Sequence, residues 1–378
     1  MGPGFRFAVL FCVIGLCLLG QTVPAVPIEV SPGSRVVIPV QALHSDGKPR
    51  TLRMLLDTGA TTCVLDRRAA EGLVVGPSKP LEVTGFAPGS RMAFQFTFRA
   101  LSLGNRTQGN VPVLVLDMAR SNRWSDEPVD GFLGMSFLEG TAFTLDPQAK
   151  TFRWGIAAPE VHWFPLLQHF RDVRPYVRMD AGEGLEEALL DTGAGGTLYG
   201  VKIPLGTDCE LAGGLTGARP IGIGRRRIEV FGEAFEGTRV CSGGRQLILG
   251  AVFLCAGTTV FDFEKRRLGL SKDSVGRLQR APANSGEVFF PIAWNRKGPV
   301  PFLEVAELAA CSRWHQAGFR EGDRVLEVEG GTDSSLTLNR LNAQIMNGYP
   351  LTWILQRGKQ RFSLISPTEK EIQWFQRP

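Results

Sequence analysis

The chain has 378 residues, of which 43% are hydrophobic and 21% charged, and its formal net charge is +5 at pH 7. This length predicts two or three domains, and the composition excludes both a disordered chain and a protein that crosses a membrane many times. The densest basic run, Arg225 to Arg227, is too short for a nucleic-acid-binding face, so we expect no nucleic acid partner. Only 4 histidines occur, none in a His-Glu-x-x-His pattern, which argues against a zinc hydrolase and against a histidine-based relay. We expect no cofactor.

The amino terminus has the pattern of an export signal. Arg6 precedes an unbroken apolar stretch over residues 7–20, which is followed by Val23-Pro24-Ala25 at the positions that a signal peptidase reads. This apolar stretch is too short to span a bilayer comfortably. We therefore predict a signal peptide over residues 1–25 and an exported protein, secreted or periplasmic. The alternatives are an uncleaved, membrane-associated anchor and a buried helix.

Cleavage of that segment would leave an odd number of cysteines, so at least one thiol is unpaired within a monomer. A disulfide is permitted in an exported protein, and Cys209 with Cys241 is the candidate pair, although the sequence alone leaves the pairing open. Cys63 lies in an apolar run with no histidine near it in the sequence. It is predicted to be a buried structural thiol and not a nucleophile.

The chain also repeats itself. The segment Leu-Leu-Asp-Thr-Gly-Ala occurs at residues 55–60 and again, identically, at 189–194. A second matching pair of blocks follows at residues 133–138 and 249–254. The offset between the copies is 134 at the first block and 116 at the second, so the second copy is 18 residues shorter between them, in a predicted loop region. The sequence thus predicts two related halves.

Each half is predicted to be β structure. In the first half, residues 51–56 form a short apolar strand that ends at Asp57, and residues 91–103 alternate so that Met92, Phe94, Phe96 and Phe98 share one face. A glycine-containing hairpin follows each aspartate, at Thr84-Gly85 in the first half and at Thr216-Gly217 in the second. The predicted fold class is mainly β, with two lobes that arose by internal duplication.

The repeated aspartates suggest a specific chemistry. Two carboxylates brought face to face cannot both ionise cheaply, so they share a proton, and one can act as a general base for water while the other acts as a general acid. The threonine hydroxyl can hydrogen-bond across to the other loop, and glycine lets the two backbones approach closely. A single Asp-Thr-Gly is usually a plain turn, but two copies in matching surroundings favour a paired site. The predicted catalytic residues are Asp57 and Asp191, and the predicted supporting residues are Thr58, Gly59, Thr192 and Gly193.

At these residues the sequence resembles the aspartic proteases, and the bacterial retropepsin-like group more than the larger pepsins. The Asp-Thr-Gly-Ala segments match the active-site motif of the family, and residues 132–134 and 248–250 match its hydrophobic-hydrophobic-Gly motif. The resemblance covers about residues 28–272. It implies a closed two-lobe aspartic protease β fold that hydrolyses peptide bonds of extended polypeptides with an activated water, without an acyl-enzyme and without a metal.

The resemblance further implies that the first hairpin is a flap over the substrate, with Thr84, Gly85 and Phe86 at or near its tip. The tyrosine typical of pepsin flaps is absent, and Ala60 and Ala194 stand where pepsins place Ser or Thr. We therefore expect an optimum that is only mildly acidic.

The pattern changes after Leu270. A polar stretch over residues 273–286 is predicted to be a linker. A strand at 302–305, a helix from about 336 to 347 and two further strands follow, and the Ala-Gly-hydrophobic, Gly-Asp and Val-x-Gly run within 317–330 resembles a PDZ domain. Such a domain binds a peptide by adding it as a strand beside a helix. The alternative is a small α+β module that only packs against the protease lobes.

Together these patterns predict an exported, monomeric aspartic endopeptidase with a PDZ-like domain for docking substrates or partners. The rival hypothesis is a catalytically inactive protease fold that serves as a peptide-binding scaffold. Intact motifs in both halves argue against it, and the duplication disfavours a homodimer with one Asp per subunit. The predicted order is signal peptide 1–25, N-terminal lobe 26–155, C-terminal lobe 156–272, linker 273–286 and PDZ-like domain 287–367.

Overall fold

The computed structural model describes residues 24 to 367, apart from 32–33, 87–88, 159, 204–208, 214–217, 245, 281–290, 333–335 and 347–348. The predicted signal peptide therefore lies outside the described residues except for Pro24 and Ala25. Within the described part, no helix has the length and apolar character needed to cross a membrane.

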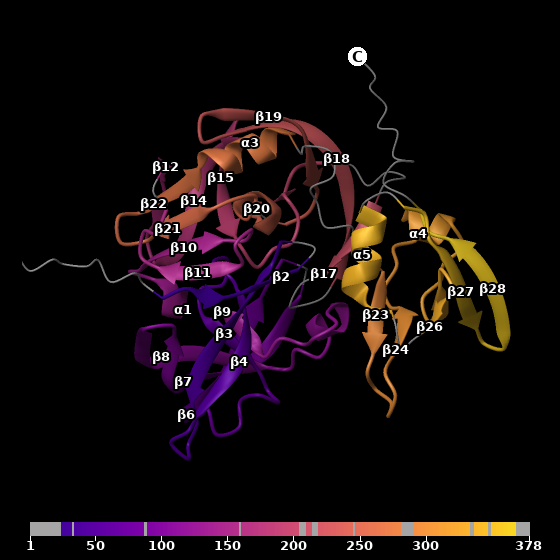
Figure 1. Cartoon of the computed structure of the whole chain (residues 1–378), viewed down its shortest axis with the longest axis horizontal. Coiled ribbons are helices and arrows are strands. Elements are labelled where there is room, and N and C mark those ends of the chain that lie inside the picture. The colour runs from indigo at the N-terminus through magenta and orange to yellow at the C-terminus, as the bar shows by residue number, and fades with distance from the viewer. Residues whose placement is uncertain are drawn as a thin grey trace, which may run out of the picture.

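The structure confirms the mainly β fold class, and Figure 1 shows two β lobes with a smaller module beside them. The first lobe is an eight-stranded sheet that begins after the segment expected to be cleaved. Its elements are β2 (Glu29–Val30), β3 (Val36–Leu43), β4 (Pro49–Leu56), β5 (Cys63–Asp66), β6 (Val74–Thr84), β7 (Ser90–Leu103), β8 (Arg106–Leu116), η1 (Ser121–Trp124), β9 (Gly131–Leu133) and α1 (Met135–Leu138).

The second lobe is also built on an eight-stranded sheet, and its strand order repeats that of the first lobe position by position. The order β2-β3-β4-β9-β5-β8-β7-β6 corresponds to β13-β14-β15-β20-β16-β19-β18-β17. The outermost hairpins β6–β7 and β17–β18 are therefore counterparts. The elements of this lobe are β13 (Leu167–His169), β14 (Asp172–Asp180), β15 (Leu185–Asp191), β16 (Leu198–Tyr199), β17 (Cys209–Gly213), β18 (Ala218–Val230), β19 (Glu233–Cys241), β20 (Leu247–Gly250), α2 (Ala251–Leu254) and α3 (Lys272–Arg280).

A six-stranded sheet joins the lobes and takes strands from both halves of the chain. At its centre β10 pairs with β21, where Phe143 lies opposite Phe261 and the two rings stack at 5.0 Å. Lys150 and Arg266, which are 116 residues apart, both adopt a left-handed backbone, with φ of 52° and 50°. The duplication therefore extends to the turn geometry. The strands of this sheet are β1 (Val26–Pro27), β10 (Ala142–Asp146), β11 (Thr151–Trp154), β12 (Val161–Pro165), β21 (Thr259–Asp262) and β22 (Arg267–Ser271).

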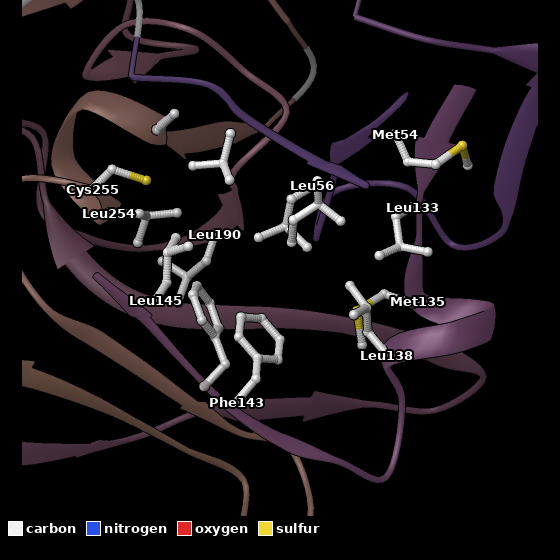
Figure 2. Close-up of a cluster of buried hydrophobic side chains, with 14 of the residues drawn as sticks. Met54, Leu56, Leu133, Met135, Leu138, Phe143, Leu145, Leu190, Leu254 and Cys255 are labelled. Carbon is white, nitrogen blue, oxygen red and sulfur yellow. The ribbon is translucent and has the colours of Figure 1, made fainter. Parts of the chain in front are cut away.

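One hydrophobic core runs through both lobes. Figure 2 shows Leu56 and Leu190, the residues just before the two aspartates, buried together near Phe143 and Leu254. Both leucines are fully buried. The apolar residue before each aspartate thus anchors its loop in a core that the two halves share, which places the two loops near each other.

The C-terminal module has its own core around Trp314 and Trp353 and its own sheet, in the order β23-β24-β25-β27-β28. The predicted helix and strands of this region are present within one to two residues of their expected bounds. The elements are β23 (Ile292–Asn295), β24 (Phe302–Val305), α4 (Arg313–Gln316), β25 (Arg324–Val328), β26 (Gly331–Thr332), α5 (Leu338–Met346), β27 (Thr352–Arg357) and β28 (Gln360–Ile365).

Three expectations need correction. The first part of the predicted linker is the helix α3, because Val275 and Leu278, three residues apart, pack on the common core; residues 281–290 lie outside the described residues. The shared apolar face predicted for β7 is not uniformly buried. Phe98 is fully buried but Met92 is 59% exposed, because this end of the hairpin extends beyond the core.

The proposed Cys209–Cys241 pair is wrong. Cys209 forms a disulfide with Cys311, which lies 102 residues further along the chain, and Cys241, which is buried, is not its partner. Pairing is decided by which side chains the fold brings together, and Cys311 belongs to the module and not to the second lobe. Cys63 is buried, as expected, and burial raises the pKa of its thiol to about 11, so the reactive thiolate form is disfavoured.

Candidate active site

The two aspartates occupy equivalent positions at strand ends. Asp57 follows β4 and Asp191 is the last residue of β15. Each of these strands pairs in parallel with the strand of the hydrophobic-hydrophobic-Gly motif, β4 with β9 and β15 with β20. The backbone N–H of Asp57 donates to the carbonyl of Leu133 at 3.1 Å. The second motif therefore holds the active-site loop from one side in each lobe.

The glycine of the second motif is required by close packing. A Cβ atom on Gly134 would lie 2.6 Å from the carbonyl oxygen of Thr62, and one on Gly250 would lie 2.5 Å from that of Gly196. The next N–H in each chain segment, that of Met135 or Ala251, donates to a carbonyl of the active-site loop. Only glycine allows the two backbones to come this near.

The two threonines link the loops across the molecule. The hydroxyl of Thr58 accepts from the N–H of Thr192 at 3.1 Å and donates to the carbonyl of Leu190 at 2.7 Å. Reciprocally, the hydroxyl of Thr192 accepts from the N–H of Thr58 at 3.1 Å and donates to the carbonyl of Leu56 at 2.9 Å. Both threonines are fully buried. Each hydroxyl thus satisfies two backbone groups of the opposite lobe.

Loss of one hydroxyl should destabilise the protein. In the Thr58→Val variant the shape is kept, but the N–H of Thr192 and the carbonyl of Leu190 lose their partner, so we expect the free energy of unfolding to fall by about 2–5 kcal/mol. Urea titration followed by tryptophan fluorescence measures this change. Thr58→Ser is the matched control because it keeps the hydroxyl and should retain most of the stability. Equal losses in the two variants would contradict the role of the hydroxyl.

The two glycines bring the loops into direct contact at the carboxyl groups. A Cβ on Gly59 would lie 2.3 Å from Cγ of Asp191, and a Cβ on Gly193 would lie 2.6 Å from Cγ of Asp57. The backbone of each loop therefore faces the carboxyl group of the other. This reciprocal contact places all six residues named from the motif, namely Asp57, Thr58, Gly59, Asp191, Thr192 and Gly193, in one site.

The electrostatics of the two aspartates differ. Burial raises the pKa of Asp57 well above its ordinary value, and the neighbouring Asp191 raises it further. Burial also raises the pKa of Asp191, but the backbone N–H groups of Gly193 and Ala194 donate to its Oδ1 at 2.8 and 3.0 Å and the charge of Arg174 lowers it. Backbone N–H groups of Gly59 and Ala60 act on Asp57 in the same downward direction, so the two carboxyl groups share one proton as a pair.

Sequence reasoning missed Arg174. Its guanidinium donates to Asp172 through Nε and Nη2, and Tyr176 donates to the same carboxylate at 2.9 Å. Tyr176 pairs with Leu189, and Val37 pairs with Leu55, the residue equivalent to Leu189 in the first half. Tyr176 and Val37 therefore occupy equivalent positions. Two residues before them, Arg174 corresponds to Arg35 of the first lobe. An alignment of the two halves upstream of the aspartates could have revealed this arginine pair.

The pKa directions predict how activity should depend on pH. Cleavage needs one carboxyl group of the pair ionised and the other protonated, so activity should fall on the acid side as the pair takes up a second proton and on the alkaline side as it loses the shared one. Because burial raises both pKa values above the ordinary 3.8, we expect a bell with its maximum around pH 4–6 as an order-of-magnitude window. The measurement is kcat/KM against pH.

Ala60 and Ala194 provide the control for this profile. Neither has a side-chain donor, so replacing both by Ser should add a donor toward the carboxylates and shift the bell toward acid. A wild-type optimum near pH 2, or no shift in the double variant, would contradict this explanation.

The predicted flap residues lie at the end of the β6–β7 hairpin. Thr84 and Gly85 are exposed, whereas Phe86 is half-buried and reaches across to the second lobe. Its ring meets that of Tyr199 edge-on at 5.3 Å, and it packs on an apolar cluster that includes Ile221. The hairpin therefore bridges the two lobes at Phe86. In the described part of the chain, no group of three or more His, Cys, Asp or Glu side chains is placed to bind a metal ion.

The fold and the site together define a two-lobed β protein with one carboxyl group from each half at a shared centre. Residues 40–137 match the family model described as Aspartyl protease. The match runs from β3 to α1 and contains Asp57, and it supports an aspartyl protease family for this chain. No curated protein matches the chain. The likeness of the second lobe rests on the strand order and the loop contacts above.

Proposed function

We propose that the chain is an exported, single-chain aspartic endopeptidase that acts on polypeptides in extended conformation. The observation that carries this proposal is the reciprocal contact of the two loops, in which Gly59 faces the Asp191 carboxyl group and Gly193 faces that of Asp57. A turn with only a structural role does not need two half-buried carboxyl groups in contact, because two negative charges brought together away from water repel each other unless they share a proton. The family match over the first lobe supports the same class of enzyme.

The proposed reaction uses both carboxyl groups at once. Asp191, ionised, takes a proton from a water molecule whose oxygen attacks the peptide carbonyl carbon, while Asp57 gives its proton to the carbonyl oxygen. The resulting tetrahedral diol breaks down when Asp191 passes its new proton to the amide nitrogen and Asp57 recovers a proton from one hydroxyl. The C–N bond breaks, and the pair returns to its starting protonation without an acyl-enzyme.

We further propose that the protein is exported with cleavage near Ala25, from its amino-terminal pattern, and that it is a monomer, from the internal duplication. Peptide docking by the PDZ-like module stays a prediction. The contacts of Asp126 with β23 and α5, described below, favour the alternative in which the module packs against the lobes.

The test is cleavage of a mixed peptide library by the purified protein, with and without pepstatin. New termini that appear in the absence of pepstatin and disappear in its presence support an aspartic endopeptidase. The Asp57→Asn variant serves as the control against a contaminating protease, because a contaminant would cleave equally well in that sample. Absence of cleavage from pH 3 to pH 7, together with tight binding of library peptides, would support the inactive scaffold instead.

A further inference from the structure

The C-terminal module is attached to the first lobe by ion pairs. Arg123 donates to Glu304 at 2.5 Å, and Arg120 lies 2.8 Å from Glu307. The glutamate side chains are only 15% and 18% exposed, so water screens these pairs less than it screens pairs on the open surface. Both arginines belong to the η1 segment of the first lobe or directly precede it.

Asp126 makes the attachment specific. Its Oδ1 accepts from the indole N–H of Trp294 at 3.0 Å and from the backbone N–H of Leu338 at 2.7 Å, and its Oδ2 accepts from the N–H of Asn339 at 2.9 Å. The last two are N–H groups of the first turn of α5, where a negative charge is favourable. A residue of the first lobe thus caps a helix of the module.

Arg296 completes the attachment. Its guanidinium donates to the backbone carbonyls of Asn122, Ser125 and Asp126 at 2.7 to 2.9 Å. Separation of the module would replace these hydrogen bonds, and those of the Asp126 carboxylate, by hydrogen bonds to water, so each contributes only a modest net free energy, but together they fix the geometry of the contact. The first-lobe segment also lies along β23, which is the edge strand of the module sheet. The module is therefore held in one orientation on the first lobe.

The module is tied to the second lobe by a covalent bond. The disulfide joins Cys311 to Cys209, with a Cα–Cα distance of 5.6 Å, and Cys209 is 1% exposed. Cys209 opens β17, which is the outermost strand of the second-lobe sheet and pairs with β18. Strand order makes the β17–β18 hairpin the counterpart of the hairpin that carries Phe86.

The β17–β18 hairpin, which carries the disulfide, also packs against Phe86 of the β6–β7 hairpin. Ala212 of β17 and Ile221 of β18 belong to the apolar cluster against which Phe86 packs, and both are almost fully buried. A shift of β17 would move the apolar cluster against which Phe86 packs. The position of the first hairpin is therefore linked mechanically to the disulfide.

We propose that the module is a clasp that bridges the two lobes, and that Cys209 and Cys311 are positioning residues that hold the β17–β18 hairpin where Phe86 can close over a bound polypeptide. The expected effect on cleavage rests on the proposed function. The expected effect on the position of the β17–β18 hairpin follows from the contacts of the module and does not depend on that function. Without the bond, the hairpin would be held only by strand pairing and by its packing in the apolar cluster, and substrate binding would weaken while the carboxyl pair stays in place.

The first experiment measures the hairpin directly, by amide hydrogen exchange with mass spectrometry in the Cys311→Ser variant. We expect the described amides of β17 and β18 to exchange at least about tenfold faster than in the wild type, with little change in β4 and β15. Dithiothreitol should have the same effect on the wild type. Cys255→Ala is the matched control, because it removes the sulfur of a free buried cysteine and should leave the hairpin protected.

The second experiment is a double-mutant cycle on peptide cleavage. Cys311→Ser alone and Asp126→Ala alone should each raise KM by about tenfold with kcat within about twofold, and the double variant should be no worse than either single variant, because both act through one clasp. Additive effects would overturn the clasp, as would a hairpin whose exchange is unchanged in Cys311→Ser. Faster exchange in a protein that cleaves no peptide would leave the clasp standing and refute the proposed function.

Discussion

Replacing either Asp57 or Asp191 by Asn is expected to abolish peptide cleavage while the protein stays folded. Each substitution keeps the shape of the side chain but removes one half of the proton-sharing pair, so the water loses its base or the carbonyl loses its acid. We expect kcat/KM to fall on the order of 10³-fold or more, with little change in substrate binding. Steady-state kinetics on a peptide selected from the library measures this loss.

The stability of the Asp57→Asn variant provides the control for folding. Because burial holds the pKa of Asp57 above its ordinary value, the folded protein keeps this proton longer than the unfolded chain as the pH rises. Stability is therefore lost between the unfolded pKa and the folded pKa, and the Asn variant escapes that loss. The Tm of the variant relative to the wild type should increase from pH 4 to pH 8. Substantial turnover in either Asn variant would refute the catalytic pair.

Alanine at Gly59 or Gly193 is expected to have the next largest effect. The added Cβ would lie 2.3 Å from Cγ of Asp191 or 2.6 Å from Cγ of Asp57, distances that real contacts do not show. Since both opposing atoms belong to the site itself, relief of the clash must move a carboxyl group. A displacement of about 1 Å from reacting geometry costs about 10²-fold in rate, so we expect kcat/KM to fall by at least that factor. Stability should fall as well, because the threonine hydrogen bonds span the same loops.

Gly109→Ala is the matched control for these variants. Gly109 lies on β8 of the first lobe, and a Cβ there would meet its nearest atom, the carbonyl oxygen of Arg99, at an ordinary 3.5 Å. This variant should retain wild-type kinetics. If Gly59→Ala kept more than half of the wild-type kcat/KM, the loops would not be in the contact described here.

Several features of the site could be predicted from the sequence because the signal is local and occurs twice. Asp57 and Asp191 stand in identical six-residue segments, each preceded by an apolar residue that must be buried. The residues of each segment are enough to form a strand and the tight turn that ends it. The duplication then implies that the two turns meet, since two related halves pack most simply about a twofold axis.

Other features depend on contacts between distant segments, for which the sequence carries no local signal. Cys209 pairs with Cys311 and not with Cys241 only because the module lies against β17. The predicted linker begins as the helix α3 because Val275 and Leu278 pack on the apolar core of the lobes. The polar residues around them give this segment the composition of a linker. The duplicated motif thus determined the pair of carboxyl groups, whereas only the tertiary structure decided how the module is attached, because that attachment depends on ion pairs, a helix cap and a disulfide between residues about a hundred or more positions apart.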